Sequence, residues 1–281
     1  MTELAVTGYA SLDYPVGLSG QVHGDQTTLI DHRDPLAWPR VGGCPAYVAR
    51  AVAAQGQTVS PVTWVGSGSD SDGFVAVLRD AGIGTNGIAR LPSERTPTAI
   101  LAYQADGSCA CLFDPVFTGE EKLTQSQRDL IGSASHLCIS VGPPQLIGTI
   151  VESRAPGARL YWLVKNDTHC FTEQIRKDLS SCADVIFCNG SERTLLAEVA
   201  QETIIVETHG TESIAIEEYG QVQTLPVDGL AVRDTTGAGD TLAGGYIAAE
   251  MAGMGDATQA AAQGLAAVRS MLEQRLERET P

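Results

Sequence analysis

The sequence predicts an α/β protein whose mainly parallel central sheet is covered on both faces by helices. In the second half of the chain, short β runs alternate with candidate helices around 145–154, 172–181 and 191–199. Such alternation is typical of a parallel sheet. Two β-rich stretches, near 12–40 and 93–115, lack a helical period and predict a small β layer at the edge of that sheet. A chain of 281 residues is long enough to bury such a core without disulfides.

The first half of the chain supplies the first strands and helices of this arrangement. The segment "ELAVTGYASLDYPV" starts with a short apolar strand that ends at Gly8. "GGCPAYVARAVAAQG" predicts a helix with Pro45 in its first turn and Gly56 at its end. "SPVTWVGSGSDSDGFVAVLRDAGI" predicts a strand, a polar loop and a second helix. Between two alternating β runs, the Ala-Asp-Gly turn at 105–107 predicts a hairpin.

The later strands are expected at "HLCISVG", "LYWLV", "DVIFCNG", "TIIVETHG" and "SIAIEEYG". The last two are close enough in the chain to form a hairpin. Two helices are expected to close the fold, at 240–252 and 256–278. We therefore expect one α/β core with a β-rich appendage.

Composition excludes several classes of function. The formal net charge of −16 makes nucleic acid or an anionic membrane surface a poor partner. The chain has no apolar run long enough to span a bilayer. Its seven cysteines form no C-x-x-C pair, which favours reduced thiols in a cytoplasmic protein. Cys109 and Cys111 are expected to share one face of a strand as packing residues.

The stretch "AVRDTTGAGDTLAGGYIAAEMA" places flexible glycines directly before Asp240 at an expected helix start. One interpretation is that Asp240 only caps the helix, because Asp is among the best N-cap residues. The other is that the N–H groups of 236–239 bind a phosphate beside a carboxylate base. A glycine-rich turn by itself leaves both interpretations open.

The fourteen residues "DTTGAGDTLAGGYI" strongly resemble the C-terminal motif of the PfkB carbohydrate kinases, the ribokinase-like family. The resemblance covers most of the chain, because six further segments are similar to segments of the same family. These segments are "GYASLDYPV", "GGCPAYVARAVAAQG", "WVGSGSDSDGFVAVLRDAGI", "TPTAILAYQADGS", "CNGSE" and "ETHG". It implies a three-layer α/β/α fold with a small β-sheet lid. The core would comprise 1–11, 41–92 and 116–281, and the lid 12–40 and 93–115.

The resemblance also implies an ATP-dependent kinase that phosphorylates a hydroxymethyl group of a sugar or a sugar-like molecule. Asp240 would act as the base, and the N–H groups of Gly237, Ala238 and Gly239 would hold the developing charge. The matched acceptor-site positions are Asp13, Gly42, Gly43 and Tyr47. The matched nucleotide-site positions are Asn189, Thr208 and Gly210.

Metal ions and a partner chain follow from the same resemblance. Glu192 would act on Mg²⁺ largely through water. Asp234 and the Thr236 carbonyl correspond to positions that hold a monovalent cation, often K⁺, in some members. Lids in this family often pair between subunits, so a homodimer through the lid strands is expected.

Two departures from the family pattern keep alternatives open. Tyr47 stands where the family usually has an Asn that contacts the substrate, so it either stacks on a ligand or packs in the core. "ATQAAAQGLAAVRSMLEQRLERETP" reads as one helix in place of a loop that walls the adenine site. A nucleoside kinase and a non-catalytic sugar- or nucleotide-binding protein are therefore the competing hypotheses. The absence of G-x-G-x-x-G after the first strand argues against a dehydrogenase.

Overall fold

A computed structural model describes residues 4–34 and 37–279 of the protein. The strands are β1 (Leu4–Thr7), β2 (Ser11–Leu18), β3 (Ile30–His32), β4 (Arg40–Gly42), β5 (Val59–Val65), β6 (Ile88–Arg90), β7 (Thr98–Tyr103), β8 (Cys109–Asp114), β9 (His136–Ile139), β10 (Arg159–Leu163), β11 (Val185–Asn189), β12 (Ile204–His209), β13 (Ser213–Glu218) and β14 (Gln221–Pro226). The helices are α1 (Cys44–Ala54), α2 (Ser69–Asp80), α3 (Gln125–Ser133), α4 (Pro144–Glu152), α5 (Glu173–Cys182), α6 (Gly190–Arg193), α7 (Ala238–Met251) and α8 (Ala257–Glu279).

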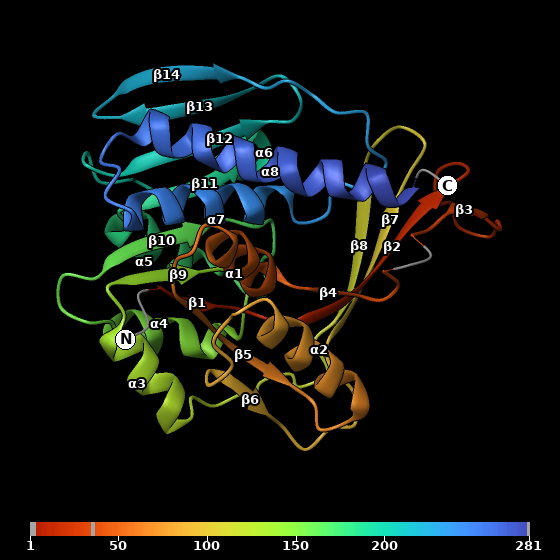
Figure 1. The fold of residues 1–281 in the computed structure, drawn as a ribbon, viewed down its shortest axis with the longest axis horizontal. Coiled ribbons are helices and arrows are strands. Elements are labelled where there is room, and N and C mark those ends of the chain that lie inside the picture. The colour runs from red at the N-terminus through yellow and green to blue at the C-terminus, as the bar shows by residue number, and fades with distance from the viewer. Residues whose placement is uncertain (1–3, 35–36, 280–281) are drawn as a thin grey trace.

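The central sheet has nine strands in the order β14-β13-β12-β11-β10-β9-β1-β5-β6 (Figure 1). Its strands run parallel from β6 to β12, and β13 and β14 are added antiparallel at one edge. The expectation of a mainly parallel sheet is therefore confirmed. Parallel strands deliver their carboxyl ends to one edge of the sheet, and ligands bind there in such folds.

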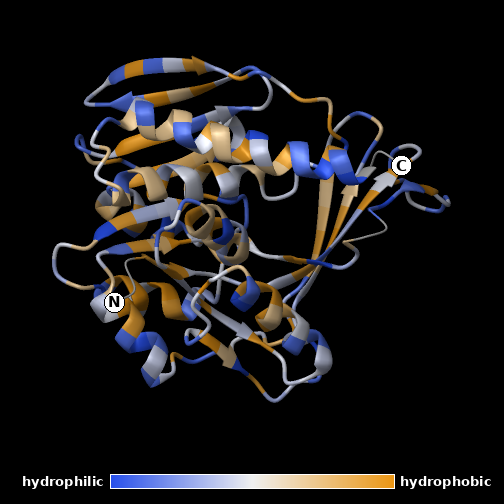
Figure 2. Cartoon of the chain, in the orientation of Figure 1, coloured by the Kyte–Doolittle hydropathy of each residue, from blue (hydrophilic) through white to orange (hydrophobic). Residues whose placement is uncertain are grey.

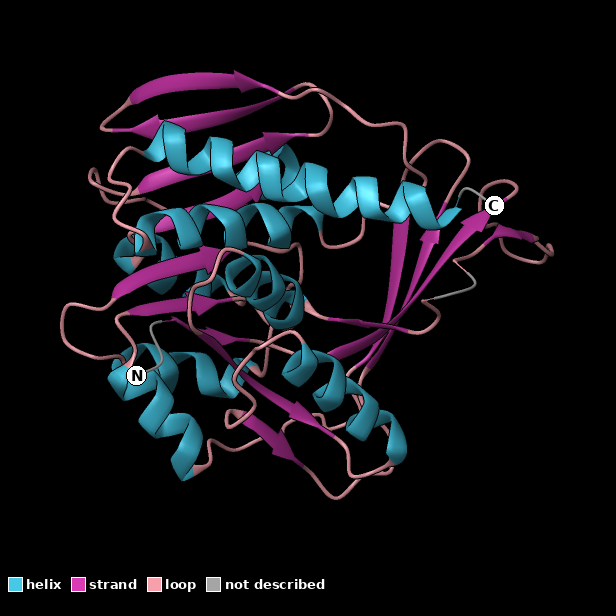
Figure 3. Ribbon diagram, in the orientation of Figure 1, coloured by secondary structure: helices cyan, strands magenta, loops and turns pink. Residues whose placement is uncertain are grey.

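Helices cover both faces of this sheet (Figure 3). Leu4 and Val6 of β1 pack into a cluster with α1, α2, α7 and α8, whereas Ala5 packs with α3, α4 and α5 on the other side. This division follows from the period of two along a strand, which points neighbouring side chains to opposite faces. Both faces are buried, so strands such as β1, β9 and β11 are almost wholly apolar (Figure 2).

A second, smaller sheet stands beside the carboxyl ends of the central strands (Figure 1). Its order is β3-β2-β7-β8, with β4 paired to β2, and it is built from the two stretches expected to form the β layer. The register places Asp13 of β2, Ala99 of β7 and Phe113 of β8 in one row. Residues paired across neighbouring strands share a face, so Asp13 and Phe113 point to the same side.

The structure corrects several expectations about individual elements. The helix expected at 191–199 is only the short α6, because Leu195, Leu196 and Val199 turn into the core instead of continuing a helix. The edge strand β14 was not expected, since its exposed sequence carries few apolar residues. The two final helices occur as expected, and α8 is continuous to Glu279.

The cysteines also differ in part from expectation. Cys109 and Cys111 share one face of β8, but both are exposed, so the prediction that they are packing residues is wrong. All seven cysteines are free thiols. No helix in the described part of the chain is both long and apolar enough to cross a bilayer.

Candidate active site

The candidate site lies where the carboxyl ends of β10, β11 and β12 meet the loop before α7. Lys165 follows β10, Asn189 ends β11, and Thr208 is paired with Asn189 in the sheet register. Asp13 faces this edge from the small sheet, and its pKa is raised in part by the charge of Asp240. Residues far apart in sequence therefore converge on one region, as the topology of parallel sheets requires.

The loop before α7 presents two backbone donors. Gly237 adopts the left-handed conformation with a φ of 75°, which favours glycine, and α7 begins directly after it at Ala238. The Ala238 N–H donates to the Thr235 carbonyl at 3.0 Å, so it is engaged within the loop. Among the described residues, the N–H groups of Gly237 and Gly239 have no backbone acceptor. These two groups, at a helix start, can bind an anion.

Asp240 is the third residue of α7, and the N-cap position before the helix is taken by Gly237. The Asp240 residue is 6% exposed, and its Oδ1 atom is buried. The Nζ atom of Lys165 lies 3.0 Å from this oxygen and forms an ion pair with it. Oδ1 has two lone pairs, so it can accept a hydrogen bond from a ligand beside this ion pair.

Electrostatics tie Lys165 to this carboxylate. Burial lowers the pKa of Lys165, but the neighbouring Asp240 outweighs it and the net pKa is raised well above the ordinary value. The Lys165 side chain remains 34% exposed, so it is accessible from solvent while it pairs with Asp240. The sequence signal for this contact is the position of Lys165 just after β10, at the edge of the sheet where α7 begins.

Asp13 is held by two side-chain donors. The hydroxyls of Ser11 and Tyr47 donate to Oδ1 at 2.6 Å and to Oδ2 at 2.9 Å. Burial raises the pKa of Asp13, and these hydrogen bonds only partly oppose the shift. The Cα of Gly42 packs directly on the carboxylate, where a Cβ would collide with it. Gly42 thus makes room for Asp13, and each oxygen of Asp13 keeps a second lone pair for a ligand.

Tyr47 lies on α1 between the two halves of the site. It is 4% exposed, its hydroxyl binds Asp13, and its ring lies against Gly237, where any side chain would collide with it. Gly43, at a φ of 83°, starts the helix that carries it. Of the two roles left open by the sequence, packing is the one present here. Tyr47 therefore contacts the Asp13 carboxylate with its hydroxyl and the loop before α7 with its ring.

Asn189 and Glu192 form a capping box at the start of α6. Asn189 Oδ1 accepts the Glu192 N–H at 2.9 Å, and Glu192 Oε2 accepts the Asn189 N–H at 2.9 Å. Burial raises the pKa of Glu192, against the opposing charge of Lys165. One carboxylate near the expected phosphates, with water for the other ligands, fits the way Mg²⁺ is usually bound. Among the described residues, no cluster of three acidic, His or Cys side chains forms a complete metal cage.

Thr208 and Gly210 lie one strand beyond Asn189. Thr208 is half-buried, and its hydroxyl makes a long contact of 3.5 Å with the Cys188 carbonyl. Gly210 is exposed at a φ of 60°, in the turn between β12 and β13. Both remain predicted nucleotide contacts at the open side of the site.

Asp234 and Thr236 are bound by two arginines. Arg40 Nη2 lies 2.6 Å from Asp234 Oδ2. Arg275 of α8 donates to the carbonyl oxygens of Asp234 at 3.0 Å and Thr236 at 2.7 Å. Burial raises the pKa of Asp234, but Arg275 and Arg40 outweigh it and leave the pKa below its ordinary value. Sequence patterns gave no signal for Arg275, which stands in an otherwise polar helix end.

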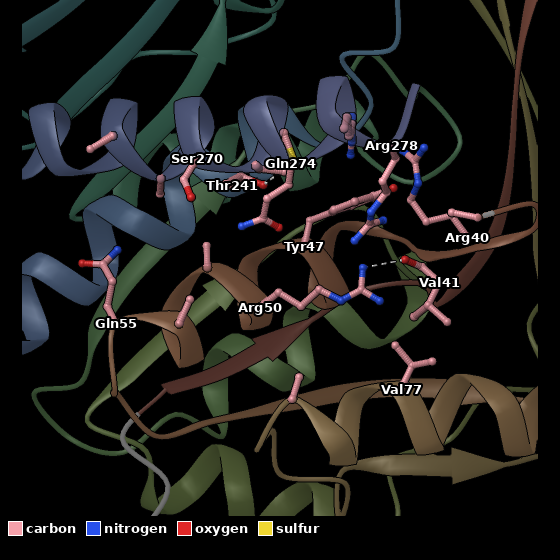
Figure 4. Close-up of a pocket in the computed structure, with 18 of the residues that line it drawn as sticks. Arg40, Val41, Tyr47, Arg50, Gln55, Val77, Thr241, Ser270, Gln274 and Arg278 are labelled. Carbon is pink, nitrogen blue, oxygen red and sulfur yellow. Dashed lines mark hydrogen bonds between the residues drawn. The ribbon is translucent and has the colours of Figure 1, made fainter. Parts of the chain in front are cut away.

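A cavity of about 740 Å³ lies behind this site, between α1 and α8. Figure 4 shows Arg40, Tyr47, Arg50, Gln274 and Arg278 around it, with Tyr47 reaching from α1 toward α8. Asp240, Lys165 and Asp13 do not line this cavity. The cavity is therefore distinct from the place where these three candidate groups lie.

Comparison with known proteins assigns the family. The fold is that of the ribokinase-like α/β kinases. The profile of the pfkB family carbohydrate kinases matches residues 32–274, and the chain belongs to this family. Its members are phosphotransferases that act on hydroxyl groups.

Individual relatives are distant in sequence and close in fold. A nucleoside kinase from Methanothermobacter thermautotrophicus is 23% identical over 89% of this chain and 83% of its own length. The ADP complex of ribokinase from Cryptococcus neoformans var. grubii serotype A superposes with a TM-score of 0.79, at 21% identity, covering 95% of this chain and 93% of that one. The Burkholderia thailandensis nucleoside kinase in complex with inosine gives a TM-score of 0.74 at 18% identity, covering 93% and 90%.

Proposed function

We propose that the protein transfers the γ-phosphoryl group of ATP to a hydroxymethyl group of a sugar or nucleoside, with Asp240 as the base. The observation that carries this proposal is the position of Asp240: a buried carboxylate in the first turn of α7, directly after the glycine loop, with its Oδ1 atom 3.0 Å from the Lys165 ammonium. Each carboxylate oxygen has two lone pairs, so Oδ1 can accept a further hydrogen bond beside this ion pair. An acceptor hydroxyl would donate that hydrogen bond and place its proton on the base.

The remaining groups have separate roles in the transfer: some orient the acceptor and others stabilise charge. Asp13 accepts hydrogen bonds from other hydroxyls of the acceptor and so orients the reacting one. The N–H groups of Gly237 and Gly239 stabilise the charge on the phosphoryl oxygens. Lys165 balances the charge of Asp240 and lies within reach of the same oxygens. Phosphoryl transfer depends mainly on this positioning and charge neutralisation.

Nucleotide and metal complete the site. Asn189, Thr208 and Gly210 line the side from which ATP would enter, at the ends of β11 and β12. Glu192 would hold Mg²⁺ through water, and the ion would neutralise charge on the phosphates. The ADP bound to the Cryptococcus ribokinase supports a nucleotide as the phosphoryl donor.

A nucleoside acceptor is favoured by one specific observation. Phe113 lies in the same row as Asp13, two strands away, which corresponds to roughly 10 Å. Its ring is 37% exposed and packs against the ring of Tyr9 at a centroid distance of 5.3 Å. An aromatic surface at that distance from a ribose-binding carboxylate suits a nucleobase. The inosine complex of the Burkholderia enzyme agrees with this choice.

A coupled assay of ADP release tests the proposal. Sugars and nucleosides are offered in parallel to the wild type and to Asp240→Asn, with Mg-ATP in excess. We expect turnover with at least one hydroxymethyl compound, and a loss of about 10³-fold in kcat for the variant. A wild type that binds sugars or nucleosides in calorimetry but yields no phosphorylated product by mass spectrometry would instead be the non-catalytic binding protein.

The lid suggests the assembly. Ile100 and Leu112 are paired on the face of the small sheet opposite to Phe113, and are 43% and 64% exposed. We expect this face to pair two chains as a homodimer in the cytoplasm. Light scattering should give a molar mass equal to two chains for the wild type. The Leu112→Glu variant should give the mass of a single chain.

A further inference from the structure

The loop that carries the anion-binding N–H groups is held from behind by a cation of the protein itself. The guanidinium of Arg275 donates to the carbonyl oxygens of Asp234 and Thr236 and lies 3.5 Å from Asp234 Oδ1. The Arg275 side chain is 9% exposed, so these contacts are shielded from water. Arg40 binds the other carboxylate oxygen of the same Asp234.

These contacts fix the orientation of the catalytic amides. In a trans peptide the C=O and the N–H point in opposite directions. A Thr236 carbonyl held on Arg275 therefore turns the Gly237 N–H to the other side of the loop. The lid adds a third support, since the Tyr103 hydroxyl lies 2.7 Å from Thr236 Oγ1. Arg275 is thus a positioning residue, which acts on the phosphate through the peptide that it binds.

The same oxygen atoms are those that the family resemblance assigns to a monovalent cation. With two guanidinium groups on Asp234 and one on the Thr236 carbonyl, the residues present do not fit K⁺. Burial and the neighbouring Arg40 lower the pKa of Arg275, but a guanidinium stays protonated in proteins. Its planar fork also binds two acceptors at once, which a lysine cannot reproduce.

We propose that Arg275 takes the place of the monovalent cation at this loop, so that phosphoryl transfer by this protein needs no K⁺. The claim that turnover needs no K⁺ rests on the proposed kinase function. The claim that Arg275 orders the loop does not depend on turnover. The feature responsible is the unbroken α8, which runs from β13 and β14 to the lid (Figure 1). Its continuous course carries Arg275 to the loop, where the guanidinium binds the two carbonyl oxygens.

The kinetic experiment compares salts and variants at constant ionic strength. Wild-type rates in K⁺, Na⁺ and tetramethylammonium should agree within about twofold, and activation by K⁺ of about tenfold or more would overturn the proposal. Arg275→Ala should lose about 10²-fold in kcat with little change in the KM of the acceptor. Millimolar guanidinium should restore part of the loss, because the cavity between α1 and α8 reaches Arg275. Arg278→Ala, one turn along α8 and exposed, is the matched control and should keep wild-type activity.

Hydrogen exchange measured by mass spectrometry gives a readout without turnover. Amides of the segment 234–240 should be equally protected in K⁺ and tetramethylammonium in the wild type, and less protected in Arg275→Ala until guanidinium is added. Wild-type protection that depends on K⁺, or equal protection in wild type and variant, would overturn the proposal. If Arg275→Ala does not fold, Arg275→Lys replaces it and should retain intermediate protection. A wild type with no turnover in any salt would refute the kinase function and leave this exchange test valid.

Discussion

The Nζ atom of Lys165 lies 3.0 Å from Oδ1 of Asp240. This ion pair fixes the direction of the carboxylate and leaves a further lone pair of Oδ1 for a ligand. We expect Lys165→Met to lower kcat by about 10²-fold, with a smaller effect on the KM for ATP. Lys177→Met, which removes an exposed lysine of α5, is the control and should leave both constants unchanged. Steady-state kinetics check this, and a loss confined to the KM for ATP would assign Lys165 to nucleotide binding alone.

The hydrogen bond from Tyr47 to Asp13 should matter for the acceptor more than for the nucleotide. Tyr47→Phe keeps the ring against Gly237 and removes only the 2.9 Å contact. We expect the variant to lose about 1–2 kcal/mol of unfolding free energy, because a buried carboxylate loses a donor. The KM for the acceptor should rise while the affinity for ADP stays the same. Denaturant titration and calorimetry measure the two effects, and unchanged acceptor binding would contradict the assigned role of Asp13.

The raised pKa of Asp13 predicts how stability depends on pH. The folded-state pKa lies above the unfolded value of about 3.9. Stability from this group is therefore complete below the unfolded pKa and is lost as pH rises through the folded pKa. Asp13→Asn should remove this decline, so the difference in Tm between variant and wild type should grow with pH across that interval. A difference in Tm that does not change with pH would contradict the shift.

Acceptor binding should show the opposite dependence on pH. The ionised form of Asp13 accepts hydroxyl donors best, so the affinity for the acceptor should fall as pH is lowered. The fall should begin at a higher pH than for an ordinary aspartate, whose pKa is about 3.9. Isothermal titration of the acceptor across this range measures the dependence, with ADP binding as the reference.

The two thiols on β8 should report occupation of the cleft. Cys109 and Cys111 lie on the same face of the lid as Phe113. Cys109 is exposed as a residue, but partial desolvation of its thiol, with help from Cys111, raises the pKa to about 11. Alkylation should therefore be slow at neutral pH and accelerate as pH rises. Saturating acceptor should slow it further, as followed by mass spectrometry of the β8 peptide. Cys182 on α5 is the control, and its rate should not respond to the acceptor.

The sequence predicts the order of the central strands and helices, and also the small sheet, because the hydrophobic periodicity of these segments is strong. Alternating strands and helices predict the parallel sheet, and the glycines before Asp240 predict a loop at its edge. The sequence did not predict the short α6, because packing of the residues after it into the core ends the helix early. It did not predict the edge strand β14, because its exposed residues lack a clear hydrophobic alternation. The unexpected contacts of the site, such as Lys165 with Asp240 and Arg275 with the loop, join segments distant in sequence. Local patterns carry no information on such pairs until the topology is known.

The position of Tyr47 has a consequence for how the two substrates bind. The Tyr47 side chain contacts Asp13, the proposed acceptor-binding carboxylate, through its hydroxyl. Its ring contacts Gly237, whose N–H is proposed to bind the phosphate. A ligand that shifts the ring from one side changes the shape offered on the other. By thermodynamic linkage, the factor by which the acceptor alters the affinity for ATP must equal the factor by which ATP alters the affinity for the acceptor.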